Sequence, residues 1–354
     1  MSTPKIKKIF FCVGISLCVF IMGTVAFGTE ELKLTHLRPH PLDTHTAAMA
    51  RVFKSLVETG SGGAIRVEIS ATGTRRDERE IMEQVQRGET QSYIASCYIM
   101  LPYYSLYDII NLPFAYSSYA VAYDVFDSSF GVEMAEDIRK KTGFRVLGFP
   151  EYAGFFQTTN SKRPIRSLED MKGLTMRPLS HPVNPLHMEV IRALGTSPTP
   201  IAWPELYASL KNGVVDGQMN PIEAIILGKL HEVQQYITLT NHLYSSYVWV
   251  INDRWYQSLS PRLKEIIVDS ARTAIAAGRG IARASESEKL LPLIADKLEI
   301  YGPTAAELAR FRKVALPAAR KHLEEKLGDE GARWIEKVLM AISEAENRAK
   351  SLAK

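Results

Sequence analysis

The residues best placed to do chemistry in this sequence are an arginine and an asparagine that each stand directly before a proline. Arg177 ends the run "LTMR" before Pro178, and Asn220 ends "VVDGQMN" before Pro221. A residue before proline is pushed toward extended backbone, so both side chains are expected at the end of a strand. In open α/β sheets, these ends form the crevice where ligands bind. A guanidinium there matches a carboxylate with two parallel hydrogen bonds, and an amide can donate or accept beside it.

Each of these residues also has a structural reading. Arg177 could instead be a structural arginine paired with Asp216 or Glu205. In the strand that leads to Asn220, Val214 and Val215 are expected to anchor a core. Asp216 and Gly217 are interpreted as architecture, a turn or bulge that lets the strand approach its neighbour.

No standard catalytic arrangement accompanies these residues. The sequence has no Gly-x-Ser-x-Gly elbow, His-Glu-x-x-His motif, Walker loop or dinucleotide-binding glycine fingerprint. Its eight histidines are scattered, and His36 and His40 straddle Pro39, so they cannot share a helix face for a metal. We therefore expect no metal and no cofactor.

The elements that must position these residues alternate between strand and helix. In the first half we expect strands at 32–39, 64–70 and 92–96, and helices at 44–57 and 77–87. In the second half we expect strands at 144–152, 174–179 and 214–220, and helices at 167–173, 184–194 and 204–211. This order favours sheets with parallel members, in two similar α/β lobes. From about 258 onward the pattern is helical, typical of long helices that tie two lobes together.

The N-terminus predicts export. Lys5, Lys7 and Lys8 precede an apolar run at 9–25, and small residues follow, so cleavage is expected after Gly28 or Ala26. The alternative is an uncleaved membrane anchor. Removing residues 1–28 takes three of the 43 basic side chains and leaves 40 against 39 acidic ones. This balance argues against a nucleic-acid partner.

Export also bears on the cysteines. Two of the three lie in the predicted leader, which leaves Cys97 alone and allows no intrachain disulfide in the mature chain. An exported protein of this kind must depend on the size of its core, and 354 residues with 46% hydrophobic content can supply one.

A long run of motifs resembles a known family. The segment 160–221 contains "KRPI", "DMKGLTMR", "ALGTSPTPIAWPELYASL" and "GVVDGQMNP", and "INLPFAY" and "VINDRWYQSLSP" stand elsewhere. Together they resemble the solute-binding subunits of tripartite ATP-independent periplasmic (TRAP) transporters, the DctP-type family. The resemblance implies a two-lobed periplasmic binding protein that closes like a flytrap over a small organic acid and delivers it to a membrane permease.

The resemblance also implies roles for particular residues. Arg177 matches the family's carboxylate-binding arginine, and Asn220 matches the asparagine that assists it. Phe156, in "AGFFQTTNSKRPI", stands where several members have a second arginine. This departure favours a monocarboxylate with an apolar or aromatic part.

Further candidates stand at or near strand ends, at the start of a helix or just before a strand, each with a structural alternative. They are Trp203, Tyr152, Ser96, Tyr244, His36 and Arg38, of which Arg38 could act as a second cation.

We predict an α/β fold of two lobes, with mixed sheets flanked by helices and long C-terminal helices. Residues 1–28 are assigned to the signal peptide. Lobe I is expected over 29–151, completed by part of 243–285, and lobe II over 152–242, completed by helices at about 286–354. Two rival functions remain open: a periplasmic enzyme acting on organic acids, and the binding subunit of an ATP-driven importer or sensor.

Overall fold

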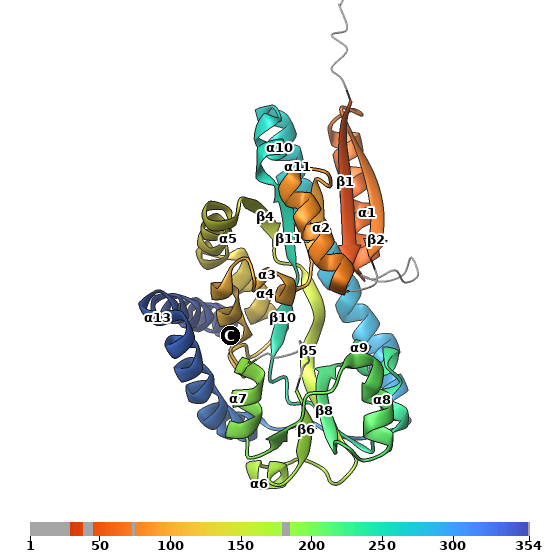
Figure 1. The fold of residues 1–354 in the computed structure, drawn as a ribbon, viewed down its shortest axis with the longest axis vertical. Helices are drawn as coiled ribbons and strands as arrows, with labels where there is room; N and C mark the ends of the chain where they lie inside the picture. The colour runs from red at the N-terminus through yellow and green to blue at the C-terminus, as the bar shows by residue number, and fades with distance from the viewer. Residues whose placement is uncertain (1–28, 38–44, 73–74, 179–184, 353–354) are drawn as a thin grey trace, which may run out of the picture.

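Two mixed β-sheets, one above the other in Figure 1, form the framework of the chain. The computed structural model describes residues 29–37, 45–72, 75–178 and 185–352, with backbone only for 75–77. The predicted leader and Arg38 lie outside the described residues. Among those described, no helix is both long and apolar enough to span a membrane.

The upper sheet has five strands in the order β2-β1-β3-β11-β4. Strands β1, β2 and β3 run parallel, and β11 pairs antiparallel with both β3 and β4. The strands and helices of this first lobe are β1 (Glu30–Leu37), α1 (His45–Gly60), β2 (Ile65–Thr72), α2 (Arg75–Arg87), β3 (Ser92–Ala95), α3 (Cys97–Met100), η1 (Ser105–Asn111), α4 (Tyr119–Asp127), α5 (Ser129–Thr142), β4 (Phe144–Gly148), β11 (Val248–Asn252), α10 (Asp253–Ser258) and α11 (Pro261–Ser285).

The lower sheet has seven strands, in the order β12-β9-β5-β8-β6-β7 with β10 beside β5. Its elements are β5 (Glu151–Asn160), α6 (Leu168–Met171), β6 (Thr175–Arg177), α7 (Pro185–Ala193), β7 (Ser197–Pro198), α8 (Trp203–Lys211), β8 (Gly217–Pro221), α9 (Ile222–Leu227), η2 (Leu230–Glu232), β9 (Tyr236–Thr238), β10 (Tyr244–Ser246), η3 (Glu286–Leu290), α12 (Leu291–Ala295) and β12 (Glu299–Tyr301). The expected two-lobed α/β fold with mixed sheets is confirmed.

Local sequence explains several of these boundaries. Helix α6 begins with the capping box expected from Ser167 and Asp170, in which each side chain accepts a hydrogen bond from the other residue's backbone N–H. Helix α5 ends at Gly143, whose φ of 76° is the left-handed conformation that glycine adopts without strain.

Two expectations about strands are wrong. The strand expected at 144–152 is two strands, because the chain leaves the upper sheet at Phe149 and Pro150 before β5 begins. The strand expected from Val214 begins only at Gly217, and Val214 is 56% exposed. Gly213, with a φ of 69°, turns the chain at this point, so Val214 faces solvent and only Val215 is buried.

Three segments link the two sheets. The chain passes from β4 to β5 at residues 149–150, from β10 to β11 at residue 247, and from α11 into η3 at residue 286. The lobe boundaries near 152 and 243 stay predictions.

The C-terminal helix α13 (Ala305–Leu352) spans both lobes. It packs against α7 below and against α4 and η1 above, and Figure 1 shows it along one side of the molecule. Gly328, at φ 62° and ψ −156°, breaks its helical geometry and allows it to bend around the two lobes.

Candidate functional site

Arg177 and Asn220 lie on neighbouring strands of the lower sheet and on the same face of it. Arg177, the last residue of β6, is the register partner of Gln218 in β8, and Asn220 follows two residues later. Paired residues share a face, and so do residues two apart on a strand. Both side chains are buried, Arg177 to 1% exposure and Asn220 to 3%.

Backbone and amide groups hold these two side chains in place. The Nε of Arg177 donates to the carbonyl oxygen of Ile201 at 3.1 Å, and Nδ2 of Asn220 donates to Oε1 of Gln218. Gln218 in turn donates to the Thr159 hydroxyl at 2.8 Å. A guanidinium fixed through Nε keeps its orientation, which pre-organises it for a planar anion.

The residues expected to be architectural in this stretch are so. Oδ2 of Asp216 accepts a hydrogen bond from the backbone N–H of Thr175 at 2.8 Å, which ties β8 to β6. A Cβ on Gly217 would lie 2.2 Å from the carbonyl oxygen of Thr159, so only glycine lets β8 approach β5 this closely.

A contact between Tyr98 and His187 joins the first lobe to the lower one. Tyr98 in α3 meets His187 in α7 edge to face, with ring centroids 6.4 Å apart. The pKa of His187 is lowered to about 4, chiefly by burial; Asp108 of η1 opposes the shift, and the positive charge of Arg177 adds to it. His187 therefore contacts the first lobe through Tyr98 and is neutral at pH 7.

Ser96, a candidate from the sequence, precedes α3 on the same lobe. Its backbone N–H and its hydroxyl donate to the two carboxylate oxygens of Glu78, both at 3.1 Å. Glu78 belongs to α2 and is 1% exposed. At the end of β3, the Ser96 hydroxyl is therefore already hydrogen-bonded to a buried carboxylate.

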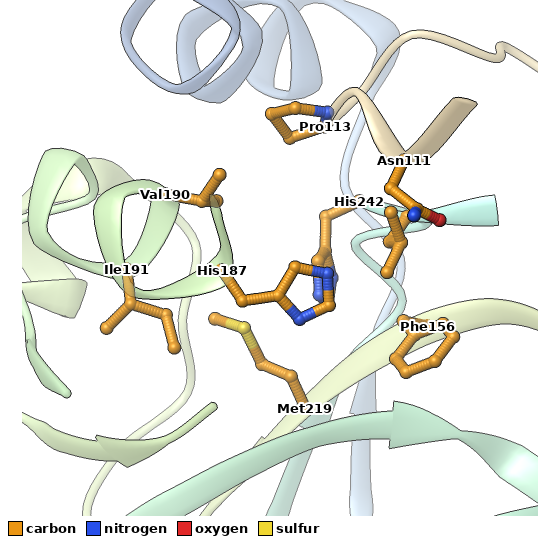
Figure 2. Close-up of a pocket in the computed structure, with 9 residues that line it drawn as sticks. Asn111, Pro113, Phe156, His187, Val190, Ile191, Met219 and His242 are labelled. Carbon is orange, nitrogen blue, oxygen red and sulfur yellow. The ribbon is translucent and has the colours of Figure 1, made fainter. Parts of the chain in front are cut away.

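Phe156 lines a small cavity close to His187, shown in Figure 2. The cavity measures about 10 Å³, and its other neighbours include Met219, Val190 and His242. Burial lowers the pKa of His242 to about 3, and the nearby His187 contributes to the shift. The wall at Phe156 is therefore apolar or neutral at pH 7.

The crossing region between the lobes holds Tyr152. This half-buried ring at the start of β5 packs edge to face on Tyr247 with centroids 4.9 Å apart. Nearby, Nδ1 of His45 in α1 stands 4.0 Å from a carboxylate oxygen of Glu223 in α9, so side chains of the two lobes meet here.

The remaining candidates are more dispersed. Trp203 is 40% exposed and lies against Gly228, where the start of α8 meets the end of α9. Tyr244 is 1% exposed, inside an aromatic cluster with Tyr119 and Phe155. His36 is buried near the end of β1, where burial lowers its pKa. Whether these side chains contact a ligand stays a prediction.

Sequence reasoning missed four residues of this region. Glu78, Tyr98, His187 and Gln218 stand in segments whose pattern is that of ordinary helices or strands. Gln218 alone had a usable signal, because it lies two residues before Asn220 on the same strand.

The described part of the chain offers no grouping typical of catalysis. No three histidine, cysteine or carboxylate side chains there come together as a metal site. The hydroxyl of Ser96 donates to a carboxylate and not to a histidine.

A buried arginine and amide at the strand ends of one lobe, with a neighbouring histidine that packs on Tyr98 of the other lobe, define a two-lobed binding protein. Comparison with known proteins gives the family. The model of the DctP family, the bacterial extracellular solute-binding proteins of family 7, matches residues 39–326. The chain belongs to this family and is a TRAP-type solute-binding protein.

Individual relatives agree with this assignment. A solute-binding protein of Verminephrobacter eiseniae is 31% identical over 70% of this chain and 71% of its own. A TRAP periplasmic solute-binding protein of Ochrobactrum anthropi, with its C-terminus bound in the ligand-binding pocket, superposes with a TM-score of 0.82 at 26% identity, covering 92% of this chain and 98% of that one. One from Polaromonas sp. JS666, bound to D-erythronate, gives 0.71 at 29% identity, over 88% and 98%.

Proposed function

We propose that this protein is the extracytoplasmic solute-binding subunit of a TRAP transporter and captures a small organic acid by its carboxylate. The observation that carries the proposal is the guanidinium of Arg177, 1% exposed at the end of β6 and held through Nε. A guanidinium matches the two oxygens of a carboxylate with parallel N–H donors, and Asn220 supplies an amide on the same face. D-erythronate, bound to the Polaromonas relative, is also a carboxylate.

The preferred ligand is a monocarboxylate with an apolar or aromatic part. Phe156 supplies no positive charge, and it lies with Met219 on the face of β5 and β8 opposite to Arg177 and Asn220. His187 and His242, which line the same cavity as Phe156, carry no charge at pH 7 because burial lowers their pKa values. A second carboxylate would therefore lose its hydration without gaining a positively charged partner among these side chains.

Closure of the lobes would complete the site. A ligand that contacts both lobes has a higher affinity for the closed arrangement and shifts the population toward it. A membrane permease could then distinguish loaded from empty protein by the arrangement of the lobes. Release of the acid to such a permease, in the periplasm, is the step that follows.

A thermal-shift panel followed by calorimetry tests the proposal. The panel contains matched acids with one and two carboxylates, including butyrate, 4-hydroxybenzoate, D-erythronate and succinate. A ligand that binds only the folded state raises the melting temperature. Each acid that binds is then incubated with the protein and checked by mass spectrometry, and a product would favour the enzyme alternative.

The decisive variant is Arg177→Gln, with Arg163→Gln as its matched control. Arg163 also donates through its guanidinium to backbone carbonyls, those of Asp170 and Lys172, but it lies beside α6. Losing one partner of a buried charge pair costs about 2–5 kcal/mol, so Arg177→Gln should weaken binding about 30-fold or more. Unchanged affinity in Arg177→Gln would show the proposed mode of capture to be wrong.

A further inference from the structure

A cluster of polar side chains lies where the three links between the lobes pass one another. Glu151 is the first residue of β5, directly after the 149–150 link, and its register partner in β10 is Ser246. Arg283 and Glu286 stand at the end of α11, where this helix passes into η3. All three connections therefore pass within reach of one carboxylate.

Glu151 is a fully buried acid with specific partners. Its side chain is 0% exposed, and its two oxygens accept hydrogen bonds from Arg283 and from the hydroxyl of Tyr123 in α4. Its carbonyl oxygen lies 3.2 Å from Nε2 of His45 in α1. A buried carboxylate must be paired in this way, because losing its partner costs much more than the pair contributes.

Tyr119 connects this group to Phe155, further along β5. Its hydroxyl donates to Glu286 at 3.1 Å and accepts the backbone N–H of Phe155, also at 3.1 Å. The guanidinium of Arg283 lies over the Tyr119 ring, 3.5 Å from its centroid, as in a cation–π contact.

The packing around Gly154 leaves no space for a side chain at this position. Its φ is 82°, and a Cβ there would lie 2.6 Å from the Tyr119 hydroxyl and 2.8 Å from Nη2 of Arg283. The crossing strand therefore runs against the cluster with its backbone in direct contact, and a change in the angle of β5 must disturb these hydrogen bonds.

We propose that Tyr119, Glu151, Arg283 and Glu286, here called the hinge cluster, are positioning residues that set the angle between the two lobes. They link α4 of the first lobe, the crossing strand β5 and the end of α11, and Arg177 and Asn220 are not among their hydrogen-bond partners in the described part of the chain. Strand β5 continues from the cluster to Phe156 and pairs with β8, which carries Asn220. The cluster thus acts on the binding site through the backbone.

The consequence for binding follows from population. If the closed arrangement is less populated, the apparent dissociation constant rises in inverse proportion to its population. Residues that modulate coupling without touching the ligand typically change affinity about two- to thirty-fold. This consequence rests on the proposed function, whereas the effect on the lobe angle does not.

Spin labels on the two lobes test the inference without any ligand. One pair, Arg66→Cys in β2 and Lys211→Cys at the end of α8, measures the distance between lobes by double electron–electron resonance. A second pair, Arg66→Cys and Arg254→Cys in α10, stays within the first lobe. Both pairs are made with Cys12→Ser and Cys18→Ser, and native Cys97 is 0% exposed.

The test substitution is Tyr119→Phe, and Tyr104→Phe is its matched control. Tyr104 also donates to a carboxylate, that of Asp137 in α5 at 2.6 Å, but both residues belong to the first lobe. We expect Tyr119→Phe to broaden the interlobe distances and add longer ones, with the intralobe pair unchanged. Glu286→Gln should act in the same direction, and Tyr104→Phe should change neither pair.

Two results would overturn the inference. One is an interlobe distribution in both Tyr119→Phe and Glu286→Gln that matches the parent. The other is broadening in Tyr104→Phe equal to that in Tyr119→Phe, which would indicate general loosening. Because no ligand is present, neither result depends on whether an acid binds at Arg177.

Discussion

The two buried histidines that line one cavity, His187 and His242, make the folded protein sensitive to acid. Burial lowers the pKa of His187 to about 4 and that of His242 to about 3, from an ordinary value of 6.5. As the pH falls below 6.5, the two histidines bind protons in the unfolded chain but stay neutral in the folded chain, so the free energy of unfolding decreases. The loss continues down to the folded pKa values and then levels off.

The size of this loss follows from the shifts. One pKa unit corresponds to about 1.4 kcal/mol. At pH 4, each histidine has therefore removed about 3 kcal/mol from the free energy of unfolding relative to pH 7. Because a typical domain has only about 5–15 kcal/mol, the pair alone could bring the protein near its unfolding threshold.

Urea denaturation at a series of pH values between 4 and 7.5 measures this dependence. In His242→Asn, an amide can still meet the Thr240 hydroxyl, which lies 2.7 Å from Nδ1 of His242 in the parent. This variant and His187→Asn should be less stable than the parent at pH 7 but lose about half as much stability toward pH 4.

The reasoning would be refuted by parallel curves. If the double variant of His187 and His242 loses as much stability between pH 6.5 and pH 4 as the parent does, the pKa values of these two histidines are not lowered in the folded protein. The argument for a monocarboxylate would then lose one of its two supports.

Two further substitutions test the packing and the charges around the site. Gly217→Ala should destabilise the protein by about 3 kcal/mol or more, because its Cβ would overlap a carbonyl oxygen of β5 at 2.2 Å, whereas Gly302→Ala, with open space around it, should be close to neutral by the same urea assay. Lys326→Met should cost about 3–5 kcal/mol, because it leaves the Asp108 carboxylate, 1% exposed, without its partner at 3.0 Å. Lys321→Met removes an exposed ion pair with a 3.9 Å separation and should change stability by less than about 1 kcal/mol in thermal unfolding. Equal losses of stability in the two lysine variants would contradict this account.

Much of the fold could be predicted because hydrophobic patterns and helix caps depend only on residues close together in the sequence. The alternation of strand and helix gave the mixed two-lobed architecture, and Ser167 with Asp170 gave the start of α6. The error at Val214 arose because an apolar pair after a glycine looks like a strand start, whereas the turn at Gly213 rotates one of the two valines outward. Tertiary pairing with β5 and β6 decides where β8 begins.

The candidate site was predictable only in part, for a related reason. Arg177 and Asn220 are marked by the proline that follows each of them, a constraint that acts within two residues. Glu78, Tyr98 and His187 come from α2, α3 and α7, and each sits in a helical pattern that gives no sign of a site. Their place near Arg177 depends on how the helices pack across the lobes.

By itself, the sequence determined the class of protein, the arginine and asparagine at its strand ends and the loss of a second arginine at Phe156, because these depend on residue type and short-range backbone preference. Only the tertiary structure decided that His187 and His242 are neutral at pH 7, since burial and neighbouring charges set their pKa values. It alone placed Glu151 against Arg283, 132 residues apart in sequence, because the lobe crossing brings the strand and the helix together.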